Sequence, residues 1–566
     1  MIEESRAMLT LRWCDRVVYW GILVMFSRAY TLSAAVVPPE VSLATVQQLV
    51  INNGAEVQSL DPHKSHGAPE MSVMCDLLEG LFNFDNQGQI VPGVAVRWHA
   101  SADLKVWTFD LRPEARWSNG DPVTAADFVY SWRRLANPAT RSPCASYLTE
   151  MQLVNSEAVR RGEQPPEALG IQALGTHTLQ LSLSQPLAYL LSMLANPALY
   201  PLHQRTVERY GNGYDEDKWY AVSHFVGNGA YCLRSWVVNE KLLLTRSETY
   251  WNRAHTVIER VTYLTIGDEV VDIRRYQAGE IDITHYLLPT EHYLALQRQQ
   301  PNELWHFPAL SVAGYRLNTQ RAPFNDVRVR QALSLVLDRE AIVDQFLVQG
   351  EQVAYTLNSQ RVAGFKVARP DWASWPLSRR CSVAKKLLRE AGYHQHNPLR
   401  FRLLYNMSEV HEQLAVAVSD TWKNRLGAEV TLDQQEWKVF LANCLAGEYQ
   451  AARFSWPAGY NDPAALLNML QSTSSGNSAF YRSQVFDRWL EQALQAPTAA
   501  ERCRCYQQAE RLLAEEAPVI PLYHGMRSRL IKPYVGGLDR RNPMNLIYTK
   551  DLYLTQHPQA PSRYRQ

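Results

Sequence analysis

The chain has 566 residues, 46% of them hydrophobic and 20% charged, and its formal net charge is +1. This composition excludes a disordered chain and gives enough length for about two to four folded domains. Because 57 Lys and Arg residues balance 56 Asp and Glu residues, the charge gives no indication of a nucleic-acid partner.

The N-terminus has the pattern of a secretory signal peptide. Three arginines precede the apolar run 17–26, and small residues follow it. We expect residues 1–35 to be the signal, with cleavage near Ala34 or Ala35, because the apolar run is too short to span a bilayer. The alternative is an uncleaved N-terminal anchor. The pattern predicts an exported protein.

The first half of the exported chain mixes strand and helix signals. Residues 106–135 predict a strand, a turn and a helix that is capped by Thr124, with Asp127 completing a capping box. Residues 178–186 alternate as a half-buried strand, and residues 228–247 predict a hairpin.

The second half has a more regular rhythm. Residues 324–347 predict one amphipathic helix capped by Asn325 or Asp326. Further on, five consecutive segments alternate: a strand over 401–406, a helix over 411–427, a strand over 428–436, a helix over 437–447 and a strand over 449–456. Alternation at these lengths predicts βαβ units and a parallel sheet.

Ligands of such sheets bind beyond the carboxyl ends of the strands, where segments 406–411 and 456–463 meet. Arg453 lies inside the last strand, where an ionised side chain needs a partner. Either it pairs with a nearby carboxylate such as Asp462, or it faces a ligand. His411 starts a helix at the same edge, and is either a capping and packing residue or a second ligand contact.

The sequence contains no recognisable catalytic or metal-binding motif. It has no HExxH, no GxSxG and no phosphate-binding glycine loop. His63 and His66 lie in a polar loop without further zinc ligands nearby, and Cys503 and Cys505 would face different sides of a helix. Seven of the eight cysteines follow the predicted signal, so at least one stays free or bonds another chain. We therefore expect a receptor rather than an enzyme, with no cofactor and no metal.

Six segments carry a resemblance to a known family: NNGAEVQSLDPHK, ARWSNGDPVTAADFVYSW, NGAYCLRSWVVNEK, APFNDVRVRQAL, QEWKVFLA and IKPYVGGLDRRNP. From about residue 36 to residue 556 the chain resembles the periplasmic oligopeptide-binding proteins, the solute-binding protein family 5 components of peptide ABC importers. The resemblance implies an α/β fold of two lobes around a hinge, with an extra domain. It implies these boundaries: lobe I from 36–78, 203–304 and 527–566, the extra domain from 79–202, and lobe II from 305–526.

The resemblance also implies where a ligand binds. Family peptides lie extended between the lobes and pair with protein backbone, as an added strand does. The residues of this chain at ligand-binding positions are Arg453, His411, Gly459, Trp456, Tyr460, Asn461, Asp462, His66, Ala68 and Asn477.

Several positions depart from the family's pattern. The aspartate that takes the peptide's amino group is Gly459 here, in the loop WPAGYN, so an enclosed ammonium group would lose a charge-assisted bond. The cations Arg453 and His411 are kept. At other positions this chain lacks the residue that the family has. It has Leu347 where a lysine is expected, Cys444 where an arginine is expected, His66 in place of a glutamate, and Ser311 and Pro457 in place of the two cysteines that form a disulfide in some relatives.

The resemblance implies a periplasmic receptor of a Gram-negative bacterium. It would act as a monomer, capture oligopeptides or peptide-like ligands between two closing lobes, and serve an inner-membrane ABC permease. The change at Gly459 favours a specialised ligand: a modified or cell-wall-derived peptide, or an anionic non-peptide compound. Alternatives of another class are a periplasmic chaperone or sensory accessory that acts without transport, and an exported peptidase.

Overall fold

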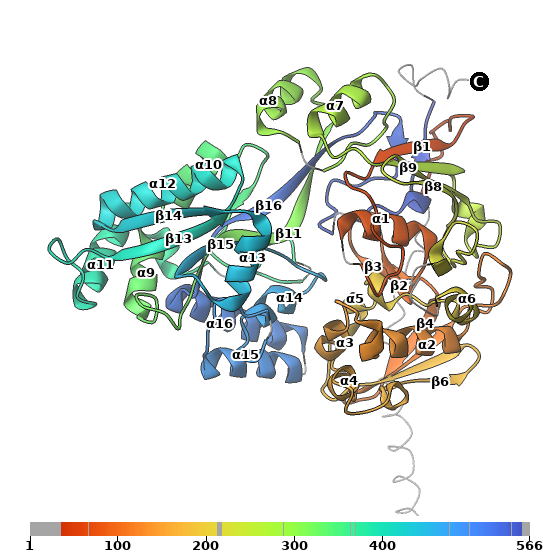
Figure 1. Cartoon of the computed structure of the whole chain (residues 1–566), viewed down its shortest axis with the longest axis horizontal. Helices are drawn as coiled ribbons and strands as arrows, with labels where there is room; N and C mark the ends of the chain where they lie inside the picture. Colours follow the sequence, from red (N-terminus) through yellow and green to blue (C-terminus); the bar gives the residue numbers. More distant parts are fainter. Residues whose placement is uncertain are drawn as a thin grey trace, which may run out of the picture.

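The computed structural model describes residues 35–556, except for 66, 212–217, 287, 363, 368, 475, 497 and 545. Residues 1–34 of the expected signal peptide, and also His66, therefore lie outside the described residues. Within the described part, the chain forms two lobes that are joined by long strands (Figure 1). None of the helices described there is long and apolar enough to cross a membrane.

The N-terminal lobe, at the right of Figure 1, contains two four-stranded sheets. One has the order β1-β10-β9-β8 and the other the order β4-β5-β7-β6. The strands are β1 (Gln48–Asn52), β8 (Tyr231–Val237), β9 (Lys241–Arg246), β10 (Arg260–Leu264), β4 (Ala95–Ala100), β5 (Val106–Leu111), β6 (Ile171–Gly175) and β7 (Thr178–Ser182). Because β1 pairs in parallel with β10, distant parts of the chain complete one sheet.

Short helices surround these sheets. They include α1 (Ala68–Leu77), α2 (Ala125–Ala136), α3 (Ser146–Glu150), α5 (Leu190–Met193) and α6 (Gln204–Tyr210). The capping box predicted for α2 is confirmed, because Thr124 N donates to Asp127 Oδ2 at 2.7 Å. The hairpin predicted over 228–247 is also confirmed as the antiparallel pair β8 and β9.

A buried polar network ties the start of the described chain to α2. Arg134 Nη2 lies 2.5 Å from Asp61 Oδ2, and both Asp61 and His63 are 0% exposed. Arg134 Nη1 donates to His63 Nδ1 at 2.7 Å, and His63 Nε2 lies 3.2 Å from Ser131 Oγ. Each polar atom of this network therefore has a protein partner, which keeps it compatible with burial.

The C-terminal lobe, at the left of Figure 1, is built on a six-stranded sheet with the order β12-β16-β11-β15-β13-β14. Its strands are β11 (Leu304–Leu317), β12 (Gln352–Val353), β13 (Arg400–Asn406), β14 (Glu429–Gln435), β15 (Ala451–Pro457) and β16 (Val519–Leu530). Strand β13 pairs in parallel with both β14 and β15, which confirms the predicted βαβ units.

Helices pack against this sheet and beside it. They are α9 (Val327–Leu335), α10 (Arg339–Phe346), α11 (Leu377–Glu390), α12 (Glu409–Leu426), α13 (Trp437–Ala446), α14 (Ala464–Leu467), α15 (Gln484–Gln495) and α16 (Ala499–Glu516). Helices α12 and α13 end before Gly427 and Gly447, which adopt left-handed φ angles of 71° and 72°. Glycine tolerates this conformation at a helix end, as the sequence predicts.

The single helix predicted over 324–347 is wrong, because the structure divides it into α9 and α10. Asp326 caps α9 as predicted, accepting from Arg328 N at 2.9 Å. A second aspartate, Asp338, accepts from Ala341 N at 3.2 Å and starts a new helix. Aspartate favours a cap over a helix interior, so the chain turns at Asp338 although the apolar spacing continues.

Strands β11 and β16 form an antiparallel ribbon that joins the two lobes (Figure 1). One end of the ribbon, at Leu304 and Leu530, packs with α7 (Glu269–Gln277) and α8 (Thr290–Gln299). The other end, at Tyr315 and Ile520, lies in the core of the C-terminal lobe. Side chains on this ribbon are therefore shared between the lobes.

Candidate ligand-binding site

Arg453 and His411 lie together at the carboxyl edge of the six-stranded sheet. Arg453 is on β15, between β11 and β13, and His411 is in the first turn of α12. Both line a small pocket that also contains Tyr315 and Tyr523. Burial, and then the charge of Arg453, lowers the pKa of His411 to about 4, so this imidazole is neutral near pH 7.

Arg453 has no carboxylate partner among the residues that the structure describes. Its Nη1 donates to Asn406 Oδ1 at 3.2 Å, and its guanidinium also contacts the Tyr523 hydroxyl. Burial lowers the pKa of Arg453, and Tyr523 opposes this effect. The pairing with Asp462 that the sequence allowed is wrong, because Asp462 Oδ2 lies 3.6 Å from Arg502 Nη2 on α16. The charge of Arg453 is thus not neutralised by a carboxylate of the described residues.

The end of β15 and the loop after it pack largely inward, but Pro457 and Gly459 are exposed. Trp456, Tyr460 and Asn461 are 6%, 4% and 8% exposed, and the ring of Tyr460 stacks on Tyr189 of the N-terminal lobe with centroids 5.4 Å apart. Gly459 is exposed, and a Cβ placed on it would meet no atom within 4 Å. The loop therefore has room for a side chain at this position and supplies no charge there.

A buried arginine lies beside one of the replaced cation positions. Leu347 and Cys444 are 8% and 2% exposed and carry no positive charge. Arg316 on β11 is 7% exposed and contacts the Cys444 thiol. Its Nη1 donates to Ser478 Oγ at 2.7 Å, whereas its Nε has no partner within the described residues. A cation on β11 thus lies where α13 lacks one.

Asn477, Ser311 and Pro457 make contacts within the fold. Asn477 bonds the backbone of a turn, and Ser311 pairs with Pro457 between two strands. Asn477 Nδ2 donates to Tyr481 O at 2.7 Å, and its Oδ1 accepts from Tyr481 N at 3.1 Å, so its side chain holds a turn. Ser311 and Pro457 are direct partners across β11 and β15, a position from which two cysteines could be bridged. The seven cysteines of the described part are all free.

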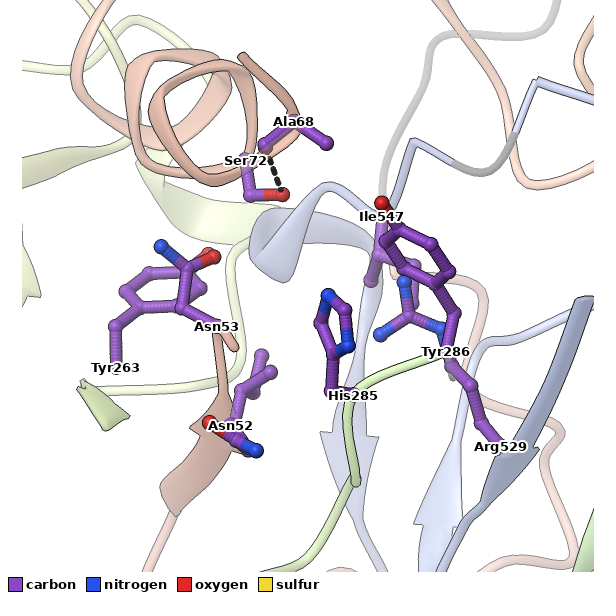
Figure 2. Close-up of a pocket in the computed structure, with 10 residues that line it drawn as sticks. Asn52, Asn53, Ala68, Ser72, Tyr263, His285, Tyr286, Arg529 and Ile547 are labelled. Carbon is purple, nitrogen blue, oxygen red and sulfur yellow. Dashed lines mark hydrogen bonds between the residues drawn. The ribbon is translucent and has the colours of Figure 1, made fainter. Parts of the chain in front are cut away.

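A second pocket lies in the N-terminal lobe, below the first turn of α1 (Figure 2). Ala68 is exposed at its edge, and His285, Tyr286 and Arg529 point into it from the opposite side. Burial, followed by the charges of nearby arginines, lowers the pKa of His285 to about 4, so this histidine is neutral near pH 7. Ala68 lines this pocket, whereas Arg453 and His411 line the other one, so the expected site residues fall into two groups.

The two pockets provide cations, hydroxyl groups and aromatic rings, which suit binding of an acidic ligand. Across the described ranges, no group of three or more His, Cys, Asp or Glu residues is arranged to hold a metal ion.

Two lobes joined by long strands, each with a pocket of polar side chains, define a two-lobed binding protein. This chain belongs to the bacterial extracellular solute-binding proteins, family 5, whose model matches residues 89–478.

Relatives of this chain have several named ligands. The periplasmic oligopeptide-binding protein OppA of Salmonella typhimurium is 45% identical over 537 residues, covering 95% of this chain and 98% of its own. The probable deoxycholate-binding periplasmic protein YgiS of Escherichia coli is 39% identical over 535 residues, covering 94% and 98%. The structure of the E. coli murein tripeptide binding protein MppA is 39% identical, with a TM-score of 0.79 over 91% and 100% of the two chains. An unliganded open form of MppA gives a TM-score of 0.80 over 92% and 99%.

The sequence could have indicated Arg316 but not Tyr523. Arg316 is an isolated charge inside the strand-like segment 313–317, the same signal that singled out Arg453. Tyr523 contacts Arg453 only because β11 brings β16 and β15 to its two sides. Pairing between strands so distant in the chain leaves no local signal.

Proposed function

We propose that this protein is a periplasmic receptor of an ABC importer. It captures a peptide or peptide-like ligand between its two lobes and serves an inner-membrane permease, as a monomer and without catalysing a reaction. The observation that carries the proposal is Arg453 at the carboxyl edge of the sheet, a cation with no carboxylate partner among the described residues, in a chain of family 5. The name of the Salmonella relative, an oligopeptide-binding protein, supports the ligand class.

The proposal divides the chain into lobe I (36–78, 203–304 and 527–566), an extra domain (79–202) and lobe II (305–526). The sheet β4-β5-β7-β6 falls wholly within the extra domain, which supports this division. The six-stranded sheet falls in lobe II apart from one end of the β11 and β16 ribbon, where the hinge would lie.

In this scheme Arg453 holds the ligand's terminal carboxylate. The neutral imidazole of His411 adds a hydrogen-bonding group beside it, and closure of the lobes excludes water and strengthens the charge pair. Backbone pairing would hold the rest of a peptide without reading its side chains.

The alternative ligand is a modified or cell-wall-derived peptide, or an anionic non-peptide compound. Gly459 favours it, because the loop supplies no carboxylate for an ammonium group and the nearby Asp462 is paired with Arg502. A chaperone or sensory accessory that acts without transport is the alternative outside the receptor class.

Native mass spectrometry of the protein purified from the periplasm, followed by calorimetry with trialanine and tetraalanine in free-amine and N-acetylated forms, tests the proposal. We expect a bound or binding peptide-like ligand that is returned uncleaved. Cleavage, or the absence of any binding and of any co-purified ligand, would contradict the receptor assignment. Uptake of the ligand that persists without the permease would favour the transport-independent alternative.

A further inference from the structure

The N-terminal lobe presents a pair of arginines next to the pocket of Figure 2. The guanidinium carbons of Arg527 and Arg529 lie over the same ring, that of Tyr286, at 4.4 Å and 5.4 Å from its centroid. Arg529 is 6% exposed, whereas Arg527 is only partly buried and accessible to a ligand. Figure 2 shows Tyr286 and the Arg529 guanidinium on one side of the pocket, next to His285.

Within the described residues, no carboxylate balances the positive charge of Arg527. In the part of the chain that the structure describes, Arg527 makes no ion pair and no hydrogen bond, and its contact is the ring of Tyr286. Burial, and then the charge of Arg527, lowers the pKa of Arg529 to about 10. The carboxylate that faces Arg529 is Asp272, whose Oδ2 already accepts from His285 N at 2.9 Å. Two cations and one carboxylate leave one positive charge, on the accessible Arg527.

Strand β16 links this arginine pair to the Arg453 pocket. Tyr523 of β16 contacts Arg453, and Arg527 lies four residues further along the same strand. Because side chains alternate along a strand, Tyr523, Gly525 and Arg527 share one face, and the two ends are about 13 Å apart at roughly 3.3 Å per residue. Gly525 has no side chain, and the small side chain of Ser311 on β11 fills the space beside it, because a Cβ on Gly525 would clash with Ser311 Oγ. The side chains between the two ends on this face are therefore small.

We infer that the ligand carries two acidic groups, one bound by Arg453 in the C-terminal lobe and the other by Arg527 on Tyr286 in the N-terminal lobe. Their separation is set by the span of β16 from Tyr523, which contacts Arg453, to Arg527, about 13 Å. The inference rests on the proposed receptor function and adds the class of ligand, an extended dianion. An extended peptide of about four residues spans this distance, so a terminal carboxylate and an acidic side chain near the other end fit the spacing. The absence of a carboxylate at Gly459 is consistent with this class, because the carboxylate that this loop does carry, that of Asp462, is paired with Arg502.

N-acetylated tetraalanine peptides test the inference, with one alanine replaced by Glu or, in a matched peptide, by Gln at each position in turn. We expect the Glu peptide to bind about tenfold or more tightly than its Gln partner at one of the first two positions. The Arg527→Gln variant should lose this preference, and Arg453→Gln should weaken both members of the pair equally. Arg540→Gln is the matched control, because Arg540 also lies over an aromatic ring, that of Trp305 at 4.6 Å, and its replacement removes the same charge.

Equal binding of Glu and Gln peptides at every position would overturn the inference, as would a Glu preference that survives in Arg527→Gln with an unchanged melting temperature. If free-amine peptides bind and none of the acetylated pairs does, the inference fails while the receptor function stands. If no peptide of any kind binds, the proposed function fails and the inference falls with it.

Discussion

Two arginines that the fold encloses, Arg134 and Arg453, have opposite surroundings. Arg134 meets Asp61 at 2.5 Å and His63 at 2.7 Å, and this network joins the first described segment to α2. Arg453 meets the neutral side chains of Asn406 and Tyr523. The charge of Arg134 is paired within the protein and holds the structure together, whereas Arg453 has no carboxylate partner among the described residues. This difference in pairing distinguishes the structural role of Arg134 from the ligand-binding role that we propose for Arg453.

The largest expected effect tests the structural half of this comparison. Asp61→Asn leaves the largely buried Arg134 without its carboxylate, and we expect a loss of about 3–5 kcal/mol in the free energy of unfolding, measured with urea. Glu157→Gln is the control, because Glu157 pairs with Arg160 at the surface and should cost about 1 kcal/mol or less. Equal losses of unfolding free energy in the two variants would show that the Arg134–Asp61 pair stabilises the fold no more than a surface ion pair does.

The second prediction tests the ligand-binding half. Arg453→Ala should weaken binding of N-acetyl-tetraalanine by about 2 kcal/mol or more, because a buried charge pair with its carboxylate is lost. The C-terminal amide of the same peptide should bind the wild type and the variant alike. Calorimetry measures the affinity of both peptides for both proteins. If the peptide with the free carboxylate binds the variant as tightly as the wild type, Arg453 lies outside the site.

The third prediction concerns pH and His63. Burial, and then the charge of Arg134, lowers the pKa of His63 from 6.5 to about 3. Between these two pH values, His63 is protonated in the unfolded chain and neutral in the folded chain. The free energy of unfolding should therefore fall as the pH drops below 6.5, with His63 responsible for about 1 kcal/mol of the loss between pH 7.5 and 5.5.

Urea unfolding of the wild type and of His63→Gln at both pH values measures this term. Other histidines with lowered pKa values contribute to both proteins, so the difference between the two slopes isolates His63. Identical slopes would show that His63 does not titrate differently on folding.

The smallest expected effect comes from restoring a carboxylate. Gly459→Asp has room, because a Cβ there meets no atom within 4 Å, and we expect about tenfold tighter binding of free-amine trialanine. N-acetyl-trialanine should gain nothing, since it carries no ammonium group. A gain for both peptides, or for neither, would mean that the loop does not lie at the amino end of the ligand.

Much of the fold could be predicted from local patterns. The alternation over 401–456 gave the parallel strands β13, β14 and β15, and glycines at 427 and 447 gave the ends of α12 and α13. The prediction failed where two signals competed, at Asp338, because apolar spacing favoured one helix and the aspartate favoured a new cap.

Fewer of the contacts within the candidate site could be predicted from the sequence. Arg453 and His411 could be placed at one edge, because both were predicted to lie near the carboxyl ends of strands in the same parallel sheet. The structure places them in one pocket. The partner of Asp462 could not, because Arg502 reaches it from α16, and Arg527 could not, because its surroundings depend on Tyr286 from another part of the chain. Side chains brought together by tertiary packing have no spacing in the sequence that reveals them.

The ribbon of β11 and β16 has a consequence for how occupancy can be observed. Movement of the lobes relative to each other must bend this ribbon, and Tyr523 and Arg527 lie on either side of Gly525 within it. A ligand bound by Arg453, which contacts Tyr523, and by Arg527 would restrain the bending segment between them. Amide protons of β16 around Gly525 should therefore exchange with solvent more slowly in the bound protein, which provides a readout that needs neither a label nor a competing ligand.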